Sequence, residues 1–298
     1  MYPSRFRYEA PRSIDEAIAL LHDGGGEAKV LAGGQSLIPL LKLRFAAPEL
    51  LVDINSLPGL DYHRFDADGT LRIGALCRHV DLERSTVLPA RQPTMAAAAP
   101  LVADPIVRNR GTLVGSLCHA DPQGDWASVV TALGGHVVAQ GPNGRRSIPI
   151  ADFVAGPFQN ALEYDEIAVE AVIPAPKGTP AGGYLKLERR VGDFATAGTA
   201  VAVELSGGTG GTVTRAGIAL TGVGGSTIDA AEAAQALVGA ALTSERIDQA
   251  ADLAARAARP RTDHRGSAEY KRHIVRTFVA RILNRVGQLD GQSQERAA

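Results

Sequence analysis

Ala32-Gly33-Gly34-Gln35-Ser36-Leu37-Ile38-Pro39 is the stretch of this sequence that decides its fold. It follows a short apolar segment, residues 29–31, and leads into a helical pattern. Two glycines without Cβ atoms leave backbone N–H groups accessible to an anion, and the next two side chains add further donors. The stretch therefore outlines a pyrophosphate cradle. Taken alone, a Gly-Gly pair at the end of a strand is more often an ordinary turn.

The size and charge of the chain set the outer limits of its function. Its 298 residues are long enough for two or three domains with a substantial core. The 31 Lys and Arg residues nearly balance the 32 Asp and Glu residues, for a net charge of −1. Because no long-range basic field exists, we expect no nucleic-acid partner, and ligands must be recognised by local chemistry.

Targeting segments and metal-binding patterns are not recognisable in the sequence. Residues 1–11 have no apolar core of a signal peptide, and no apolar run is long enough to span a bilayer, so we expect a cytoplasmic protein without an integral membrane segment. Cys77 and Cys118 are too few for an iron–sulfur cluster or a structural zinc site. If electrons pass through this chain, an organic cofactor carries them.

The N-terminal pattern predicts a small unit with parallel strands. Ser13 and Glu16 have the spacing of a capping box, and the helix that they start should end at Gly24. Short strands at residues 29–31 and 50–54 flank the cradle and a helix over 36–43. We expect this unit to end near Ser56.

The middle of the chain has a different pattern, with two hairpins, two helices and a closing strand. The turns at residues 66–69 and 142–144 are rich in Asp, Asn and Gly. The predicted elements are hairpin strands 62–65 with 70–75 and 136–140 with 145–150, helices 94–99 and 125–133, and strand 166–173.

The C-terminal third begins after a predicted linker, Pro174–Pro180, whose prolines should not continue a strand interior. Beyond it, strand patterns give way to helical ones. The predicted elements are strands 183–190, 198–205 and 213–220, followed by helices 230–238, 245–258 and 267–283.

A second group of small and polar residues, Val107–Ser116, offers a partner for the first cradle. We expect a loop in which Gly111, Thr112, Gly115 and Ser116 supply backbone and hydroxyl donors to the same phosphates from the other side. Asp125 follows at a predicted helix start. It could cap that helix, or its carboxylate could accept hydrogen bonds from a ribose.

Four further features have a simple interpretation. Cys118, His119 and Asp121 lack the second ligand pair of a closed metal site, and Ser36 lacks a nucleophile elbow. Residues 222–227 imitate a dinucleotide fingerprint, but no βαβ unit follows, so we expect a strand-to-helix turn. Lys186 lies on a predicted strand, where a surface position is the default.

Taken together, these segments resemble the flavin-binding medium subunit of the molybdenum hydroxylases, a family that includes aerobic carbon monoxide dehydrogenase and xanthine dehydrogenase. The resemblance runs nearly from end to end. It rests on the order and spacing of six segments, namely residues 32–39, 110–116, 119–125, 152–166, 186–195 and 267–273.

The resemblance implies an α+β protein with a two-lobed FAD-binding fold of the vanillyl-alcohol-oxidase/PCMH type, unlike a Rossmann fold. A C-terminal domain with a small antiparallel sheet and a three-helix bundle should follow. The implied domains are an N-terminal FAD-binding lobe at 1–56, a second FAD-binding lobe at 57–176 and a C-terminal flavoprotein domain at 177–288, with a disordered tail at 289–298.

The resemblance also implies which residues contact FAD. The pyrophosphate would be held by Ala32, Gly33, Gly34, Gln35 and Ser36, with Leu37 beside them, and by Thr112, Gly115 and Ser116. Asp125 would lie on the adenosine side, whereas Val102, Ile167 and Lys186 would lie along the flavin. The Lys186 ammonium would stabilise negative charge on the reduced ring. No catalytic residue and no metal ligand is implied in this chain.

One position departs from the family pattern. The second loop usually contains Gly-Gly, and here Val114 precedes Gly115. A Cβ at this position restricts the backbone, so we expect Val114 to fit the phosphate poorly.

The implied partners are a large molybdenum-cofactor subunit and a small subunit with two 2Fe-2S clusters, arranged as a dimer of heterotrimers that could lie at the inner face of the membrane. FAD in this chain would take electrons from the clusters and pass them to an external acceptor. Carbon monoxide, a purine, an N-heterocycle and an aldehyde are all compatible substrates of the partner. Rival hypotheses are a stand-alone FAD-dependent oxidoreductase of a related fold and a non-catalytic assembly protein.

Overall fold

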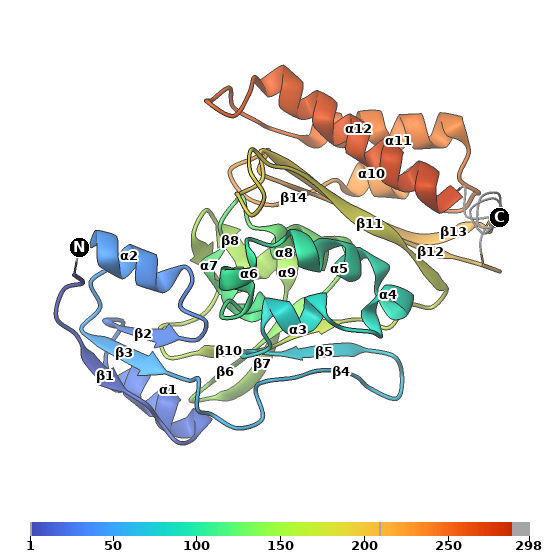
Figure 1. The fold of residues 1–298 in the computed structure, drawn as a ribbon. Coiled ribbons are helices and arrows are strands. Elements are labelled where there is room, and N and C mark those ends of the chain that lie inside the picture. Colours follow the sequence, from blue (N-terminus) through green and yellow to red (C-terminus); the bar gives the residue numbers. More distant parts are fainter. Residues whose placement is uncertain (1, 209, 288–298) are drawn as a thin grey trace.

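In the described part of the chain, three larger β-sheets follow one another and helices cover them (Figure 1). The structure is a computed structural model that describes residues 2–208 and 210–287. The predicted tail at 289–298 lies outside the described residues. Within the described ranges, no helix is both long enough and apolar enough to cross a membrane.

The first sheet is parallel, as the sequence predicts. Its strands β1 (Arg7–Glu9), β3 (Leu50–Asp53) and β2 (Ala28–Leu31) lie in that order, and α1 (Ile14–Asp23) and α2 (Leu37–Leu43) connect them. The Ser13 hydroxyl accepts a hydrogen bond from the Glu16 amide at 3.1 Å, which confirms the predicted start of α1. Strand β1 was not predicted, because its three residues are mostly exposed and show no apolar periodicity.

The second sheet is antiparallel and contains both predicted hairpins. The strand order is β4 (His63–Phe65), β5 (Leu71–Gly74), β10 (Ile167–Ile173), β6 (His136–Gly141) and β7 (Gly144–Pro149). Every residue of the central strand β10 is buried, and all of them except Glu170 are apolar. A small separate ribbon is formed by β8 (Val154–Gly156) and β9 (Gln159–Asn160).

Helices fill the space between the second and third sheets (Figure 1). They are α3 (His79–Glu83), α4 (Leu88–Arg91), α5 (Pro93–Ala98), the 3-10 helix η1 (Ala99–Leu101), α6 (Pro105–Arg108), α7 (Leu113–His119) and α8 (Asp125–Ala132), with α9 (Ile150–Phe153) at the edge. Helix α7 corrects the prediction of a loop through Ser116. The Thr112 hydroxyl accepts from the Gly115 amide at 3.0 Å, and this N-cap starts a helix that small residues alone did not predict.

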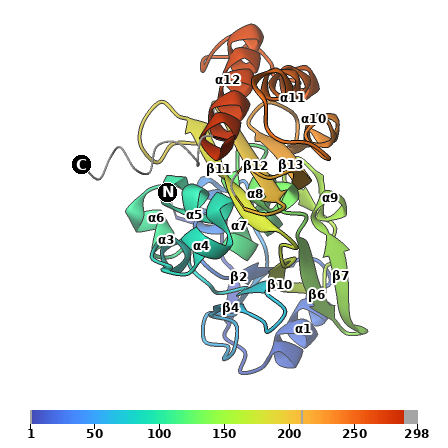
Figure 2. The ribbon, with the colours of Figure 1, turned by 90° about the vertical axis from the view of Figure 1, so that its right-hand side faces the viewer.

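The third sheet and its helices form the predicted C-terminal domain. Strands β11 (Thr179–Leu187), β12 (Ala197–Leu205), β13 (Val213–Thr221) and β14 (Ile228–Asp229) are antiparallel, and α10 (Ala231–Gln235), α11 (Ser244–Ala257) and α12 (Ala268–Gly287) lie on one face (Figure 2).

Two local features of this domain differ from the prediction. Strand β11 starts inside the predicted linker and includes Pro180, which an edge strand tolerates because its missing N–H faces no partner. The turn at residues 222–227 leads into β14 rather than directly into a helix.

The third sheet is buried on both faces, which joins the domains into one packed unit. Every residue of β12 is buried. Ala200 and Ala202 belong to the core shared with the second sheet, whereas Val201 and Val203 belong to the core under the C-terminal helices. Helix α8 crosses β13 so closely that a Cβ at Gly217 would overlap the carbonyl oxygen of Ala132. Because alternate side chains of β12 pack into the two cores, this strand positions α8 and the residues of its first turn.

Candidate functional site

The first glycine loop leaves several backbone donors without a partner. Residues 32–36 connect β2 to α2, and Gly34 has a φ of +74°, which favours glycine. Among the described residues, the amides of residues 34–37 donate to no other group. The Ser36 hydroxyl makes no capping bond, and Gln35 Nε2 lies 3.4 Å from the Gly33 carbonyl oxygen. The loop therefore presents a set of N–H and O–H donors that fits an anion.

The second loop lies directly against the first. A Cβ at Gly33 would overlap the carbonyl oxygen of Arg110 and come within 2.8 Å of the Gly111 Cα. Only glycine at position 33 permits this approach. The structure thus brings together two segments that are far apart in the sequence, as the proposed two-sided cradle requires.

Two side chains that sequence reasoning missed connect these loops. Asn55 Nδ2 donates to the carbonyl oxygen of Ala32 at 2.8 Å, and Arg78 Nη1 donates to that of Arg110 at 2.6 Å. Arg78 Nη2 donates to Asn55 Oδ1 at 2.7 Å, which completes the connection. An Asn after a strand and an Arg before a short helix carry no motif, so no local signal pointed to them.

Val114 lies in the first turn of α7, not in a loop. Its side chain is 2% exposed and packs in the main core, and its φ is not positive. Helical backbone accommodates a Cβ, so the reason for expecting a misfit is absent. The Val114 amide donates to no other group of the described residues, whereas the Gly115 amide is taken by Thr112.

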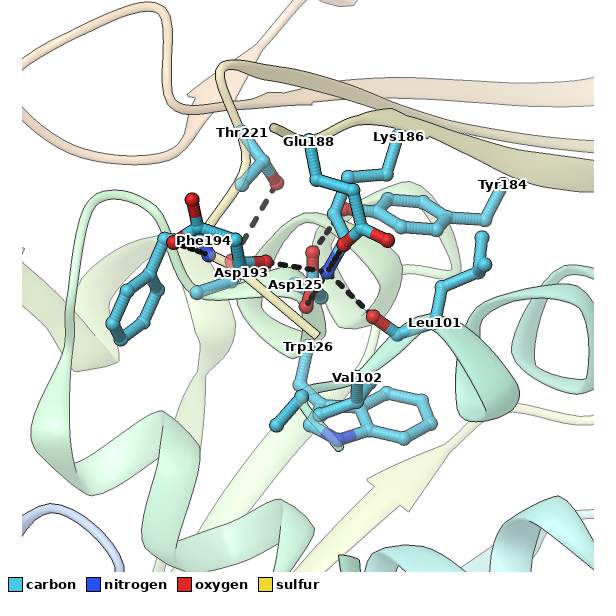
Figure 3. A network of polar contacts seen from close by, with 12 residues as sticks. Leu101, Val102, Asp125, Trp126, Tyr184, Lys186, Glu188, Asp193, Phe194 and Thr221 are labelled. Atoms are coloured by element: carbon cyan, nitrogen blue, oxygen red, sulfur yellow. Dashed lines mark hydrogen bonds and ion pairs between the residues drawn. The ribbon is translucent and has the colours of Figure 1, made fainter. Parts of the chain in front are cut away.

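A second cluster surrounds the Lys186 ammonium where β11 meets α8 (Figure 3). Lys186 has a side chain that is 1% exposed, so the expected default of a surface lysine is wrong. Nζ lies 3.2 Å from Asp125 Oδ2 and donates to the carbonyl oxygens of Leu101 and Asp193. Tyr184 Oη donates to Asp125 Oδ1 at 2.6 Å.

This cluster contains two carboxylates and one ammonium. Burial raises the pKa of the Asp125 carboxyl, and the Lys186 charge and the Tyr184 hydroxyl oppose that rise. Burial and the Asp125 carboxylate raise the pKa of Tyr184 well above its usual value. Glu188 Oε2 lies 3.2 Å from Lys186 Nζ, within ion-pair distance, but no described group has hydrogen-bond geometry toward it. With Lys186 charged and both carboxylates ionised, the cluster carries a net charge of −1.

The predicted site residues thus separate into two groups. Those of the two loops lie together, and Asp125 lies with Lys186, next to Leu101 and Val102 (Figure 3). Because Asp125 and Lys186 touch, they cannot mark the adenosine and flavin ends of one extended ligand, so that part of the prediction disagrees with the geometry. Ile167 is 2% exposed within the main core.

A buried histidine, His79, contacts the second loop. His79, 4% exposed, donates its backbone N–H to the Gly111 carbonyl at 3.0 Å, and its Nδ1 accepts from Trp126 Nε1 at 3.0 Å. Burial, with Arg108 and Arg78 nearby, lowers the pKa of His79 to about 4. The imidazole is therefore neutral, with its proton on Nε2.

A separate cleft of about 250 Å³ is lined by Tyr62, Arg64, Arg72, Arg145 and Glu170. None of the predicted site residues lines it. In the described ranges, no group of three His, Cys, Asp or Glu residues is arranged to hold a metal ion.

We expect Lys186→Met to destabilise the protein by about 3–5 kcal/mol, because Asp125 and Glu188 would keep buried charge without a cation. The matched control is Lys271→Met. Lys271 is equally buried, but its partner Asp263 is 38% exposed and can be solvated. Urea unfolding of both variants at pH 7 measures the difference, and equal losses would contradict the role given to the buried pair.

We expect His79→Gln to make stability less sensitive to acid. The folded pKa of about 4 lies below the unfolded value of roughly 6.5, so the unfolded state binds more protons between these pH values and the native protein loses stability as the pH falls. The Gln side-chain oxygen can accept the hydrogen bond from Trp126 Nε1, but the Gln amide does not titrate. Between pH 7 and pH 5 the variant should lose about 2 kcal/mol less than the wild type in urea unfolding. Parallel pH curves would contradict this.

Comparisons with known proteins agree with the two-part architecture. A family model described as the FAD binding domain in molybdopterin dehydrogenase matches residues 4–176. A second model, the CO dehydrogenase flavoprotein C-terminal domain, matches residues 183–286.

Curated relatives and solved structures match over nearly the whole chain. The carbon monoxide dehydrogenase medium chain of Hydrogenophaga pseudoflava is 44% identical over 95% of this chain and 98% of its own. The 6-hydroxypseudooxynicotine dehydrogenase complex subunit alpha of Paenarthrobacter nicotinovorans is 40% identical over 95% of each chain. A structure of quinoline 2-oxidoreductase from Pseudomonas putida 86 superposes with a TM-score of 0.87 at 32% identity, covering 97% of this chain and 99% of that one. The chain therefore belongs to the family of FAD-binding medium subunits of the molybdenum hydroxylases.

Proposed function

We propose that this chain holds FAD as the electron outlet of a molybdenum hydroxylase, with the pyrophosphate between the two glycine loops. The observation that carries the proposal is the contact of Gly33 with the Arg110 carbonyl, beside the unpartnered amides of residues 34–37. Backbone donors that converge from two segments are suited to a group with several anionic oxygens. The Ser36 hydroxyl and the Val114 amide add donors.

Lys186 and its neighbours are suited to the flavin end of the same cofactor. A buried ammonium that is fixed by two carbonyl oxygens and Asp125 is a preorganised positive charge, which would favour negative charge on the pyrimidine edge of a flavin. Tyr184 holds Asp125 in place from the C-terminal domain. Asp125 is then a residue of the flavin end rather than of the adenosine end.

Bound FAD would supply the redox chemistry, taking two electrons from partner iron–sulfur clusters and releasing them to an external acceptor. The chain's own residues bind and orient the cofactor. We propose the division into lobes at 1–56 and 57–176 with a C-terminal domain at 177–288, assembly as a dimer of heterotrimers, and a cytoplasmic complex that can lie at the inner membrane face. The related chains carry names with different substrates, which supports substrate choice in the molybdenum subunit.

The direct test is to purify the chain with the subunits encoded beside it. We expect a yellow complex with a flavin absorbance spectrum that also contains molybdenum and iron. A complex without flavin, or without molybdenum and iron, would overturn the proposal. Reduction of the isolated flavin-loaded chain by substrate under anaerobic conditions would favour the stand-alone oxidoreductase instead.

Gly33→Ala should weaken FAD binding, because the new Cβ would overlap the Arg110 carbonyl and push the loops apart. We expect the dissociation constant, measured by quenching of flavin fluorescence, to rise by at least roughly tenfold, equivalent to about 1.4 kcal/mol. Gly156→Ala is the control, since its Cβ would meet Gln159 at an ordinary 3.4 Å. Unchanged affinity in Gly33→Ala would argue against the two-loop site.

A further inference from the structure

The two glycine loops come from different lobes, and one backbone carbonyl lies at their contact. The Arg110 oxygen is approached by Gly33 on one side and receives a hydrogen bond from Arg78 Nη1 at 2.6 Å. The contact itself is made by backbone atoms of Gly33, Arg110 and Gly111 and contributes little apolar burial. Something else must fix how far apart the loops lie.

The orientation of the Asn55 amide is determined by its neighbours. Nδ2 donates to the Ala32 carbonyl at 2.8 Å and to Asp53 Oδ1 at 2.6 Å, and Oδ1 accepts from Arg78 Nη2 at 2.7 Å. The opposite orientation would set the amide oxygen against two acceptors and the NH₂ against a guanidinium. Tyr8 Oη donates to Asp53 Oδ2 at 2.6 Å, so the acceptor is itself fixed by the first sheet.

Arg78 spans the gap with two nitrogens of its planar group. One donates to the Arg110 carbonyl and the other to Asn55, while the backbone N–H of Arg78 donates to Asp81 Oδ2 at 2.9 Å. The side chain is held at its base and at its end. Lysine has a single nitrogen and could not reproduce this fork.

We propose that Asn55 and Arg78 are positioning residues that set the separation of the two loops and thereby the affinity of the chain for FAD. This inference rests on the proposed function. A pyrophosphate that is bound from both sides requires one fixed spacing of its donors, and loops that are already ordered at that spacing lose less entropy on binding. Neither side chain needs to touch the cofactor.

The first experiment measures FAD binding to the flavin-stripped full chain by fluorescence quenching. Arg78→Met removes both hydrogen bonds, and Arg78→Lys keeps the charge but not the fork. We expect both to raise the dissociation constant roughly tenfold to hundredfold. Arg64→Met, an exposed arginine stacked on Tyr62, is the control and should bind FAD as the wild type does. If Arg78→Lys binds FAD with wild-type affinity, the positioning role of Arg78 is wrong, and attraction between its positive charge and FAD explains the affinity instead.

Asn55→Ala provides an independent arm. Because both residues act through one connection, the Asn55→Ala/Arg78→Met double variant should lose little more affinity than either single variant. Fully additive losses would overturn the proposal. Far-UV circular dichroism of each variant establishes that it is folded.

Amide hydrogen exchange of the FAD-free chain separates this inference from the proposed function. In Arg78→Met, the hydrogen-bonded amides of Ile38, at the end of the first loop, and of Gly115 and Ser116, in the second, should exchange roughly tenfold faster, whereas those of β12 should not change. Unchanged exchange in both loops would overturn the positioning role even if FAD binds. Failure of the wild-type chain to take up FAD would overturn the proposed function, and the exchange result would still decide whether Arg78 orders the loops.

Discussion

Burial of the Lys186 ammonium is the constraint on which the arrangement of the domains depends. A charge at 1% exposure is tolerated only with partners. The partners of Lys186 come from different parts of the chain. They are Asp125 at the start of α8, the carbonyl of Leu101 at the end of η1 and the carbonyl of Asp193 in the loop after β11. Each partner must be in place for the charge to be buried. The C-terminal sheet therefore cannot dock loosely on the FAD-binding domain.

Other buried polar groups between the C-terminal sheet and the FAD-binding domain also have partners. Thr94 Oγ1 donates to the Val201 carbonyl at 2.8 Å, and Thr221 Oγ1 donates to Ser128 Oγ at 2.6 Å, so buried hydroxyls find partners across the junction. Alternate residues of β12 face two different cores. Since α8 packs on β12 and β13 in this junction and α7 packs against α8, the rigidity that the junction provides extends to α7 and hence to the second glycine loop.

The two parts of the site use different physics. At the loops, the donors are backbone amides whose direction is set by a positive φ at Gly34 and by the contact of Gly33 with Arg110. At the junction, the donor is one charged side chain fixed by carbonyl oxygens. This division suits a long cofactor with an anionic middle and a ring whose charge changes on reduction. Under the proposed function, the cofactor supplies the redox chemistry.

Local signals predicted local structure well. The cap at Ser13 and the turn-bounded hairpins were confirmed because each depends on residues close in sequence. Most errors arose where the deciding partner is distant in the sequence. Pro180 has the pattern of a linker residue until β11 is known to be an edge strand. Thr112 is an exception, because the Gly115 amide that its hydroxyl caps is only three residues away. Lys186 was predicted to be a surface residue because its partner Asp125 is 61 residues away in the sequence.

By itself, the sequence determined the order of the elements, the presence of two glycine-rich segments and the resemblance to a flavin-binding family, since motifs and periodicities are written in consecutive residues. The tertiary structure alone decided that Gly33 lies on Arg110, that Asn55 and Arg78 connect the two loops and that Asp125 pairs with Lys186. These contacts join residues separated by about 20 to 80 positions. Their geometry depends on how the sheets stack, which hydrophobic burial sets for the chain as a whole.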